Sequence, residues 1–226
     1  MIHVIQDWNA HDHPGLLAQM FAMRARVFGT RLNWDVECRD GAERDALDDA
    51  SPVYLISTDR TGRVDGSCRL LPTTGPTLVS RCFADTLPDA ALLSDATIWE
   101  CTRFCVEDGA CRPGARGLGP VTLGLVRAAL GLARAGAVET LIANVNAATI
   151  RMCRRAGHPV AVLGVSHRFS PAVYLASFPV AEGAAALDRL PPPPARVAAF
   201  RPAAPALAAR AWDPSSRPAA RAARSS

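Results

Sequence analysis

Lysine is absent from this chain of 226 residues, and all 25 basic side chains are arginines. A Schiff-base lysine and a phosphate-binding P-loop both require lysine, so the sequence excludes these two kinds of catalytic site. Residues 1–180 contain 18 arginines and 18 acidic residues, whereas residues 181–226 contain seven arginines and three acidic residues. The net charge of +4 therefore lies in the C-terminal segment, and the neutral remainder does not predict a nucleic-acid partner.

Long apolar runs are also missing. No stretch approaches the ~18 apolar residues that a membrane span requires. The first residues lack the basic start and the apolar core of a signal peptide. We therefore expect a cytoplasmic protein with no membrane span.

The seven cysteines lack the spacing of a redox or metal motif. Their number is odd and none of them form a C-x-x-C pair, so reduced thiols are expected rather than a disulfide framework. The five histidines show no recognisable pairing with a cysteine, and we expect neither a catalytic thiol nor a bound metal.

Hydrophobic periodicity predicts the elements of the N-terminal half. A strand is expected at 2–6, and an amphipathic helix at 13–28 that ends at Gly29. About twenty residues, 30–50, follow with many charges and little periodicity, and they are expected to form a functional or disordered loop. Two β-rich segments, 52–58 and 64–71, predict a hairpin around a turn at 59–62.

The C-terminal half alternates between strand and helix patterns. The expected elements are a strand at 97–107, a helix at 120–135, a strand at 138–145, a short helix at 147–156, and strands at 158–163 and 168–178. A hairpin followed by this alternation predicts an α/β sandwich with a mixed sheet over residues 1–180. Residues 181–226 are rich in Pro, Ala, Arg and Ser, which predicts a disordered tail.

The strand at 97–107, TIWECTRFCVE, carries Glu100 and Arg103 in an otherwise β-prone run. Charged side chains are rarely buried without a partner, so two interpretations are open: a solvated ion pair on an edge strand, or a polar cleft for a zwitterionic ligand. Residues three apart point to opposite faces of a regular strand. A shared cleft therefore requires a β-bulge; otherwise one of the two faces the cleft and the other braces a loop.

Several other polar or aromatic residues occupy unusual places. Arg24 lies on the apolar helix and Arg69 lies inside a strand, whereas Trp34, Asp45 and Asp48 lie in the charged loop. Taken singly, each has an ordinary structural explanation, such as a snorkelling arginine or a helix cap.

Taken in order, these residues form a constellation that resembles the acyl-homoserine-lactone synthases, the LuxI-type autoinducer synthase family. The match comprises MRARVF at 23–28, Trp34, Asp45, Asp48, CRLL at 68–71, Phe83, Glu100, RFCV at 103–106 and RRAGHP at 154–159. It covers about residues 1–180. The resemblance implies a three-layer sandwich, a mixed twisted sheet flanked by helices, similar to the GCN5-related N-acetyltransferase fold. In such a fold two adjacent parallel strands, here 97–107 and 138–145, part to hold an acyl thioester.

The implied reaction joins S-adenosylmethionine to an acyl thioester that is carried by acyl-carrier protein or coenzyme A. S-adenosylmethionine is then a substrate, and no cofactor is expected. The residues implied as catalytic are Glu100, Arg103, Asp45 and Asp48. Glu100 would accept the proton of the substrate amine, the aspartates would clamp the ligand, and Arg103 would bind the substrate carboxylate. The residues implied in substrate binding are Arg24, Phe28, Trp34, Arg69, Phe83 and Phe104.

An apolar acyl pocket is expected between the parted strands and the neighbouring helices. Its candidates, which also fit an ordinary core, are Val121, Leu125, Leu141, Asn144, Val145 and Met152. The sequence departs from the family in two places. Ala46 and Leu47 stand between the loop aspartates, where an aromatic residue is usual. The strand LIANVN at 141–146 lacks the threonine that often accompanies 3-oxo products, which argues against a 3-oxo preference.

Two other functions remain open at this point. Another acyl-CoA-dependent N-acyltransferase of the same fold would show an R/Q-x-x-G-x-G/A pyrophosphate loop, which RPGARG at 112–117 matches only faintly. A regulatory binding protein that has lost catalysis would use the basic tail as its interaction arm. The presence of Glu100, Arg103, Asp45 and Asp48 argues against that third function.

Overall fold

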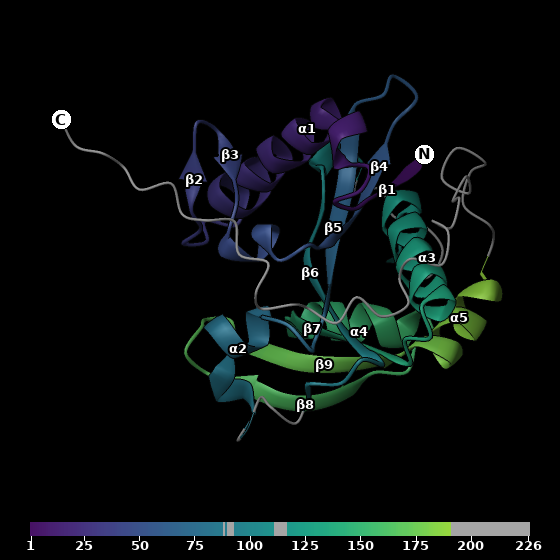
Figure 1. The fold of residues 1–226 in the computed structure, drawn as a ribbon. Helices are drawn as coiled ribbons and strands as arrows, with labels where there is room; N and C mark the ends of the chain where they lie inside the picture. The colour runs from purple at the N-terminus through teal and green to yellow at the C-terminus, as the bar shows by residue number, and fades with distance from the viewer. Residues whose placement is uncertain (88, 90–92, 111–116, 191–226) are drawn as a thin grey trace.

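A mixed seven-stranded sheet forms the centre of the computed structural model, which describes residues 1–87, 89, 93–110 and 117–190 (Figure 1). The strand order is β1-β4-β5-β6-β7-β9-β8. The strands are β1 (Ile2–Ile5), β4 (Val53–Thr58), β5 (Val64–Pro72), β6 (Ile98–Val106), β7 (Thr140–Val145), β8 (Ala161–Ser166) and β9 (Val173–Pro179). β6 and β7 run parallel and the other neighbouring pairs run antiparallel, so the predicted mixed sheet is confirmed.

Helices cover both faces of this sheet (Figure 1). The helices are α1 (Pro14–Arg24), α2 (Leu78–Cys82), α3 (Pro120–Ala135), α4 (Ala147–Arg155) and α5 (Val180–Asp188). The alternation along β4 shows why two layers form: Val53 and Leu55 pack in the core beneath α3, whereas Tyr54 and Ile56 pack in the core beneath α1. The three-layer sandwich implied by the resemblance is confirmed.

The parallel strands β6 and β7 stay paired over only three residues. Ile98, Trp99 and Glu100 pair with Thr140, Leu141 and Ile142. Beyond this point β6 continues to Val106 alongside β5, and β7 continues to Val145 alongside β9. Helix α3 connects the two strands. Because they pair over only three residues, the expected parting of two parallel strands is confirmed. We call the space between the two strands beyond Glu100 and Ile142 the interstrand gap.

The region expected to be an irregular loop is largely ordered. The first helix does not end at Gly29, because α1 continues as a π-helical segment over Ala25–Arg31. A small hairpin of β2 (Cys38–Arg39) and β3 (Ala42–Glu43) follows, and then a 3₁₀ helix over Ala46–Asp49. The hairpin turns at Asp40 and Gly41, which have φ angles of 51° and 75°. An Asp-Gly pair is a strong signal for a two-residue hairpin turn. The expectation of a loop over residues 30–50 was therefore wrong at this point.

The predicted domain boundary at residue 180 is too early. Residues assigned to the tail form α5, which packs against α3 and places Leu187 and Leu190 in the main core. Residues 191–226 lie outside the described residues, so the predicted disorder stays a prediction there. The RPGARG segment also lies outside the described residues, except for Gly117.

Candidate functional site

Three arginines and three carboxylates meet on the α1 side of β5 and β6. We call this set the arginine–carboxylate network: Arg24 from α1, Glu43 from β3, Asp45 and Asp48 from the 3₁₀ segment, Arg69 from β5 and Arg103 from β6. Their formal charges cancel. Because an unpaired buried charge is very costly, pairing of this kind is what allows six ionised groups to lie in one place.

Asp48 is the centre of the network and has no exposed side-chain surface. Its two carboxylate oxygens accept hydrogen bonds from Arg24 Nη1 and Nη2, at 2.9 and 3.0 Å. One of them also accepts from Arg69 Nη1 at 2.7 Å and from the Tyr54 hydroxyl at 2.8 Å. Arg24 thus connects α1 to Asp48 of the 3₁₀ segment. The buried position suits Asp48 to holding the loop in place rather than to touching a ligand.

Asp45 is the most exposed carboxylate of the network, with 22% of its side chain accessible. Arg69 holds it in bidentate fashion, from Nη1 at 2.6 Å and from Nη2 at 3.0 Å. Its Oδ1 also accepts from the backbone N–H of Leu47, which caps the 3₁₀ helix. Arg69 and the Leu47 N–H thus hold the Asp45 carboxylate in place, and part of it stays accessible to a ligand.

The arginines hold these carboxylates in their ionised form. Burial alone would raise the pKa of Asp48, but the hydrogen bonds and charge of Arg24 and the charge of Arg69 hold it well below its usual range. Burial would likewise raise the pKa of Asp45, and the contacts with Arg69 and Arg103 lower it. Asp45 and Asp48 are therefore ionised at neutral pH.

Arg103 lies at a β-bulge. Ser67 and Arg69 of β5 pair with Cys105 and Thr102 of β6, so two residues of β6 oppose one residue of β5. Arg103 has a φ angle of 50°, in the left-handed region. Its Nε and Nη2 contact Glu43 Oε1 at 3.0 and 2.9 Å, and Nη2 contacts Asp45 at 2.7 Å. The strand is irregular as predicted, but the bulge falls at Arg103 itself, and Arg103 braces the loop.

Glu100 does not face solvent and does not pair with Arg103. Its side chain is fully buried, and its two oxygens accept from the backbone N–H groups of Leu78 and Val79, at 2.7 and 2.8 Å. These donors open α2, so the carboxylate lies at the helix N-terminus. Burial raises the pKa of Glu100, although the two backbone donors and the charge of Arg69 oppose that rise. Glu100 lies in the last residue pair before β6 and β7 part.

The predicted aromatic residues fall into two groups. Phe28 is buried and stacks on Trp34 with a centroid distance of 5.2 Å, and the guanidinium of Arg103 lies 5.5 Å from the Phe28 ring. Trp34 is 54% exposed, so one aromatic face beside the network is accessible. Phe104, in the bulge, is 36% exposed. Phe83 follows α2 and packs against Phe169, with a centroid distance of 5.1 Å.

The expected acyl-pocket residues do not all lie on one face of the sheet. Val121 and Leu125 of α3 belong to the main core, where they contact Gly66 of β5, so their surroundings are those of ordinary core residues. Leu141 also faces that core, and Met152 packs at its edge. Val145 shares the face of Leu141, whereas Asn144 points to the opposite face, with Ile142.

Sequence analysis missed three members of the site. Glu43 is completely buried and bridges Arg24 and Arg103, while Tyr54 and Thr102 bind Asp48 and Arg69 Nε. The Asp-Gly turn would have placed Glu43 on a strand, next to the loop aspartates. Tyr54 and Thr102 look like ordinary strand residues, and only tertiary contacts show their role.

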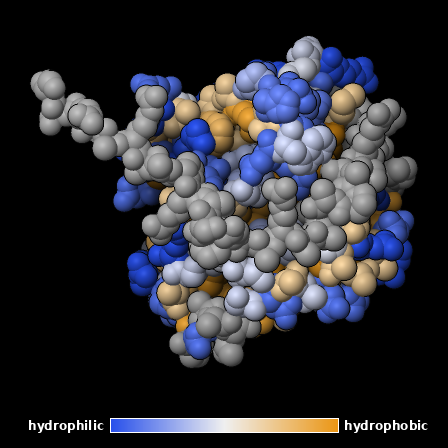
Figure 2. Space-filling model, in the orientation of Figure 1, coloured by the Kyte–Doolittle hydropathy of each residue, from blue (hydrophilic) through white to orange (hydrophobic). Residues whose placement is uncertain are grey.

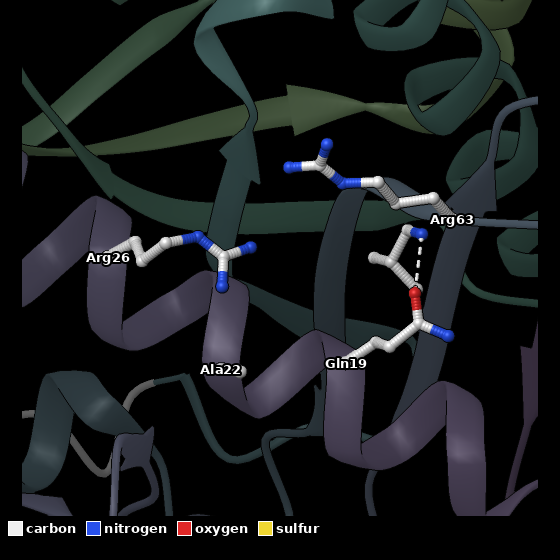
Figure 3. Close-up of a pocket in the computed structure, with 5 residues that line it drawn as sticks. Gln19, Ala22, Arg26 and Arg63 are labelled. Atoms are coloured by element: carbon white, nitrogen blue, oxygen red, sulfur yellow. Dashed lines mark hydrogen bonds between the residues drawn. The ribbon is translucent and has the colours of Figure 1, made fainter.

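Other features do not add to this site. A surface pocket beside α1 is lined by Gln19, Ala22, Arg26, Arg63 and Val64, with Gln19 Oε1 accepting from the backbone of Val64 (Figure 3). None of the predicted site residues line it. Within the described ranges there is no cluster of His, Cys, Asp or Glu that could hold a metal, and no helix is long and apolar enough to cross a membrane. Polar side chains cover much of the surface in the orientation of Figure 1, with scattered apolar ones between them (Figure 2).

Comparison with known proteins identifies the family. The model of the autoinducer synthase family matches residues 8–186. The acyl-homoserine-lactone synthase of Rhizobium radiobacter is 37% identical over 150 residues, which are 66% of this chain and 70% of that protein. The acyl-homoserine-lactone synthase of Acinetobacter nosocomialis is 29% identical over 175 residues, or 73% of this chain and 96% of that protein.

Solved structures agree with this assignment. The AHL synthase LasI aligns with a TM-score of 0.72 and 28% identity, over 83% of this chain and 93% of LasI. The CoA-dependent synthase BjaI, solved with SAM and isopentyl-CoA, aligns with a TM-score of 0.73 and 28% identity, over 86% and 90%. An N-acyl amino acid synthase, FeeM, shares the fold at 13% identity. The chain belongs to the autoinducer synthase family, whose curated members are acyltransferases that make acyl-homoserine lactones.

Proposed function

We propose that this protein makes an N-acyl-L-homoserine lactone from S-adenosylmethionine and an acyl thioester, and releases methylthioadenosine. The observation that carries the proposal is the parting of β6 and β7 directly after Glu100, beside the arginine–carboxylate network. We place the extended thioester between the parted strands, and the network offers charges of both signs to a zwitterionic acceptor. A general N-acyltransferase would not need this combination of Arg24, Asp45 and Asp48 with the Phe28–Trp34 pair.

S-adenosylmethionine carries an ammonium, a carboxylate and a sulfonium, and the network and Trp34 together offer a partner for each. Arg103 uses Nε and Nη2 for Glu43 and Asp45, so we assign its Nη1 to the substrate carboxylate. Asp45, which is partly exposed, suits the ammonium. The exposed face of Trp34 suits the sulfonium or the adenosyl group, because aromatic faces attract cations. In this proposal Asp48, Arg24 and Glu43 position the groups that touch the substrate.

The atoms of the first step define what the protein must do. The ammonium loses a proton, its nitrogen attacks the thioester carbonyl, and the C–S bond breaks to release a thiol. Of the two protons that the nitrogen loses in forming the amide, one ends on the leaving sulfur and one leaves the site. In the second step the carboxylate oxygen attacks the carbon next to the sulfonium, and the C–S⁺ bond breaks to give the lactone and methylthioadenosine.

Glu100 is our candidate for the group that takes the proton. Because burial raises its pKa, the carboxylate of Glu100 is a stronger base than the carboxylate of an exposed glutamate, which favours proton acceptance. Each oxygen already accepts one backbone N–H, and each retains a second acceptor site. Because the side chain has no exposed surface, we assign the proton transfer to a route through one water molecule.

The donor could be coenzyme A or acyl-carrier protein. BjaI is described as CoA-dependent, and it is 28% identical to this chain, as is LasI. Arg151, Arg154 and Arg155 are exposed on α4 and would suit either an acidic carrier protein or a coenzyme A phosphate. The free thiols of the described cysteines fit a reducing compartment such as the cytoplasm.

The test of this function is a product assay. The protein is incubated with S-adenosylmethionine and a panel of acyl-CoA and acyl-carrier donors, and mass spectrometry follows the lactone and methylthioadenosine. We expect both products from at least one donor. Absence of lactone with every donor would refute the proposal.

The role of Glu100 is tested by Glu100→Gln, with Glu107→Gln, just beyond β6, as the matched control. Loss of a positioned base should lower kcat/KM by about 10²–10⁴-fold and remove the acid limb of the pH–rate profile. A purely structural role at the start of α2 would lower activity at every pH and leave the acid limb in place. The Glu107→Gln variant should keep both the rate and the profile.

A further inference from the structure

Asn144 lies on the wall of the interstrand gap that the network does not reach. It is two residues beyond Ile142, the last residue of β7 that pairs with β6. Its side chain points to the same face as Ile142 and Glu100, because residues two apart on a strand share a face. On that face, across the gap, β6 presents Thr102, which binds Arg69.

The side-chain amide of Asn144 is buried and unpaired. Its Nδ2 and Oδ1 each expose less than 1 Å² and have no hydrogen-bond partner among the described residues. Leaving such a group unpaired costs free energy, so the amide destabilises the free protein. Of the described side chains, Ser57 and Asp65 also contain a buried unpaired atom, but they lie on β4 and β5, away from the gap.

An amide offers two N–H donors and a carbonyl acceptor on one plane. A ligand that contains amide groups offers an N–H to Oδ1 and carbonyl oxygens to which Nδ2 can donate. S-adenosylmethionine is assigned to the other wall, since its proposed partners are Asp45 at the 3₁₀ segment, Arg103 on β6 and Trp34, and β7 contributes none of them. The group beside β7 is then the arm of the acyl donor.

Distances along the strand agree with this assignment. Two residues of β7 span about 6.6 Å, so Asn144 lies about that far along the gap from the Glu100–Ile142 pair. In a pantetheine arm, four bonds separate the thioester carbon from the nitrogen of the nearest amide. Four bonds of an extended chain cover about 5 Å, and the asparagine side chain can span the difference.

We propose that Asn144 binds the donor through the pantetheine amide nearest the sulfur, whose N–H it accepts at Oδ1. Coenzyme A and acyl-carrier protein present the same arm, so the contact serves either donor. The inference rests on the proposed function, because that function places a thioester in the gap. It also reassigns Asn144 from the acyl pocket to the donor arm.

The test combines a substitution in the protein with one in the substrate. Acyl thioesters of N-acetylcysteamine contain the amide in question, and thioesters of 2-acetoxyethanethiol replace its N–H by oxygen at the same length. The wild-type protein should use the amide donor about tenfold better in kcat/KM. Asn144→Leu, of similar volume, should lose that preference and keep the KM for S-adenosylmethionine. An unchanged preference in the variant, or a raised KM for S-adenosylmethionine, would overturn the inference.

A binding measurement separates this inference from the proposed function. An alkyl-CoA thioether cannot react, so calorimetry with this probe reports donor binding even if no lactone is ever formed. We expect about tenfold weaker binding by Asn144→Leu and unchanged binding by Ser57→Ala, which also removes a buried unpaired polar atom. Equal binding by Asn144→Leu and the wild-type protein would refute the inference, whatever the product assay gives.

Thermal unfolding gives an independent sign. Removing an unpaired amide should raise the Tm of the free protein by a few degrees, while donor binding falls. A large fall in the Tm of Asn144→Leu would show that the amide supports the fold instead, and would contradict the inference.

Discussion

The two walls of the interstrand gap are built differently. On the β5–β6 wall, three guanidinium groups and three carboxylates hydrogen-bond to one another. On the β7 wall, the Asn144 amide is buried with neither of its polar atoms paired. In the free protein the charged groups of the β5–β6 wall are paired with one another. The Asn144 amide of the β7 wall has no hydrogen-bond partner among the described residues.

The difference follows from the cost of leaving each kind of group unpaired. An isolated buried charge costs far more free energy than a neutral amide, which costs about 1–3 kcal/mol. Charged groups of a site must therefore be paired before the ligand arrives, whereas a neutral amide can wait for it. The network fixes geometry in advance, and we infer that the amide is completed by the ligand.

The largest expected effect on stability comes from replacing Asp48, the central carboxylate of the network. Asp48→Asn leaves Arg24 and Arg69 without their shared carboxylate and turns one acceptor into a donor that faces arginine N–H groups. We expect the free energy of unfolding to fall by about 3–5 kcal/mol, as measured by urea denaturation.

The neighbouring residue provides the matched control. Asp49 lies in the same 3₁₀ helix, is 78% exposed at its side chain, and lies 3.5 Å from Arg44. Asp49→Asn should change the stability by less than about 0.5 kcal/mol. Similar losses for both variants would mean that the network contributes no more than a surface pair.

A smaller effect is expected from acid. Because the folded pKa values of Asp45 and Asp48 lie below their unfolded values, both stabilise the fold above pH 4 and lose that contribution as the pH falls through the folded pKa values. Between pH 5 and pH 3 Asp48 should contribute a loss of about 1–1.5 kcal/mol, and Asp45 should add to that loss. Urea titrations at several pH values measure this slope.

The same titration of Asp48→Asn sharpens the comparison. With the carboxylate of Asp48 removed, that acid-dependent loss should be clearly smaller. Equal slopes in the two proteins would show that Asp48 does not carry the shifted pKa. Asn144→Leu should not change the slope, because the β7 wall has no titrating member.

Much of the fold follows from the sequence because hydrophobic periodicity, and the prolines and glycines that begin and end helices, are local signals. The helix at 120–135 has an apolar stripe between Pro120 and Gly136, and it begins and ends as predicted. The small hairpin that contains Glu43 was missed although the Asp-Gly turn signals it, because its strands are only two residues long. Helix α5 was missed because its composition resembles that of the residues after it, and its stability comes from packing on α3.

The site was less predictable than the fold. Single-sequence reasoning found the arginines and aspartates because charge inside apolar patterns is conspicuous, and the resemblance ordered them. It could not pair them: Glu100 and Arg103 are neighbours on one strand, but Glu100 binds the start of α2 and Arg103 binds Glu43 and Asp45. Pairings of this kind depend on which loop folds over which strand, and that information is not local.

The smallest expected effect concerns the bulge at Arg103, whose side chain belongs to the β5–β6 wall. Its φ angle of 50° is unfavourable for any residue with a Cβ atom and ordinary for glycine. Arg103→Gly and Arg103→Ala lose the same ion pairs, so their difference isolates the backbone. We expect the glycine variant to be more stable by about 0.5–1.5 kcal/mol in urea denaturation.

The sign of that difference should reverse at a regular position of the same strand. Cys101 pairs with Leu70 before the bulge, where extended backbone favours alanine. Cys101→Gly should therefore be less stable than Cys101→Ala by about 0.5–1 kcal/mol. If alanine were preferred at both positions, the left-handed conformation would not be the conformation of Arg103 in solution. The bulge could then not be what turns Arg103 toward Glu43, and the network would need another explanation for its geometry on β6.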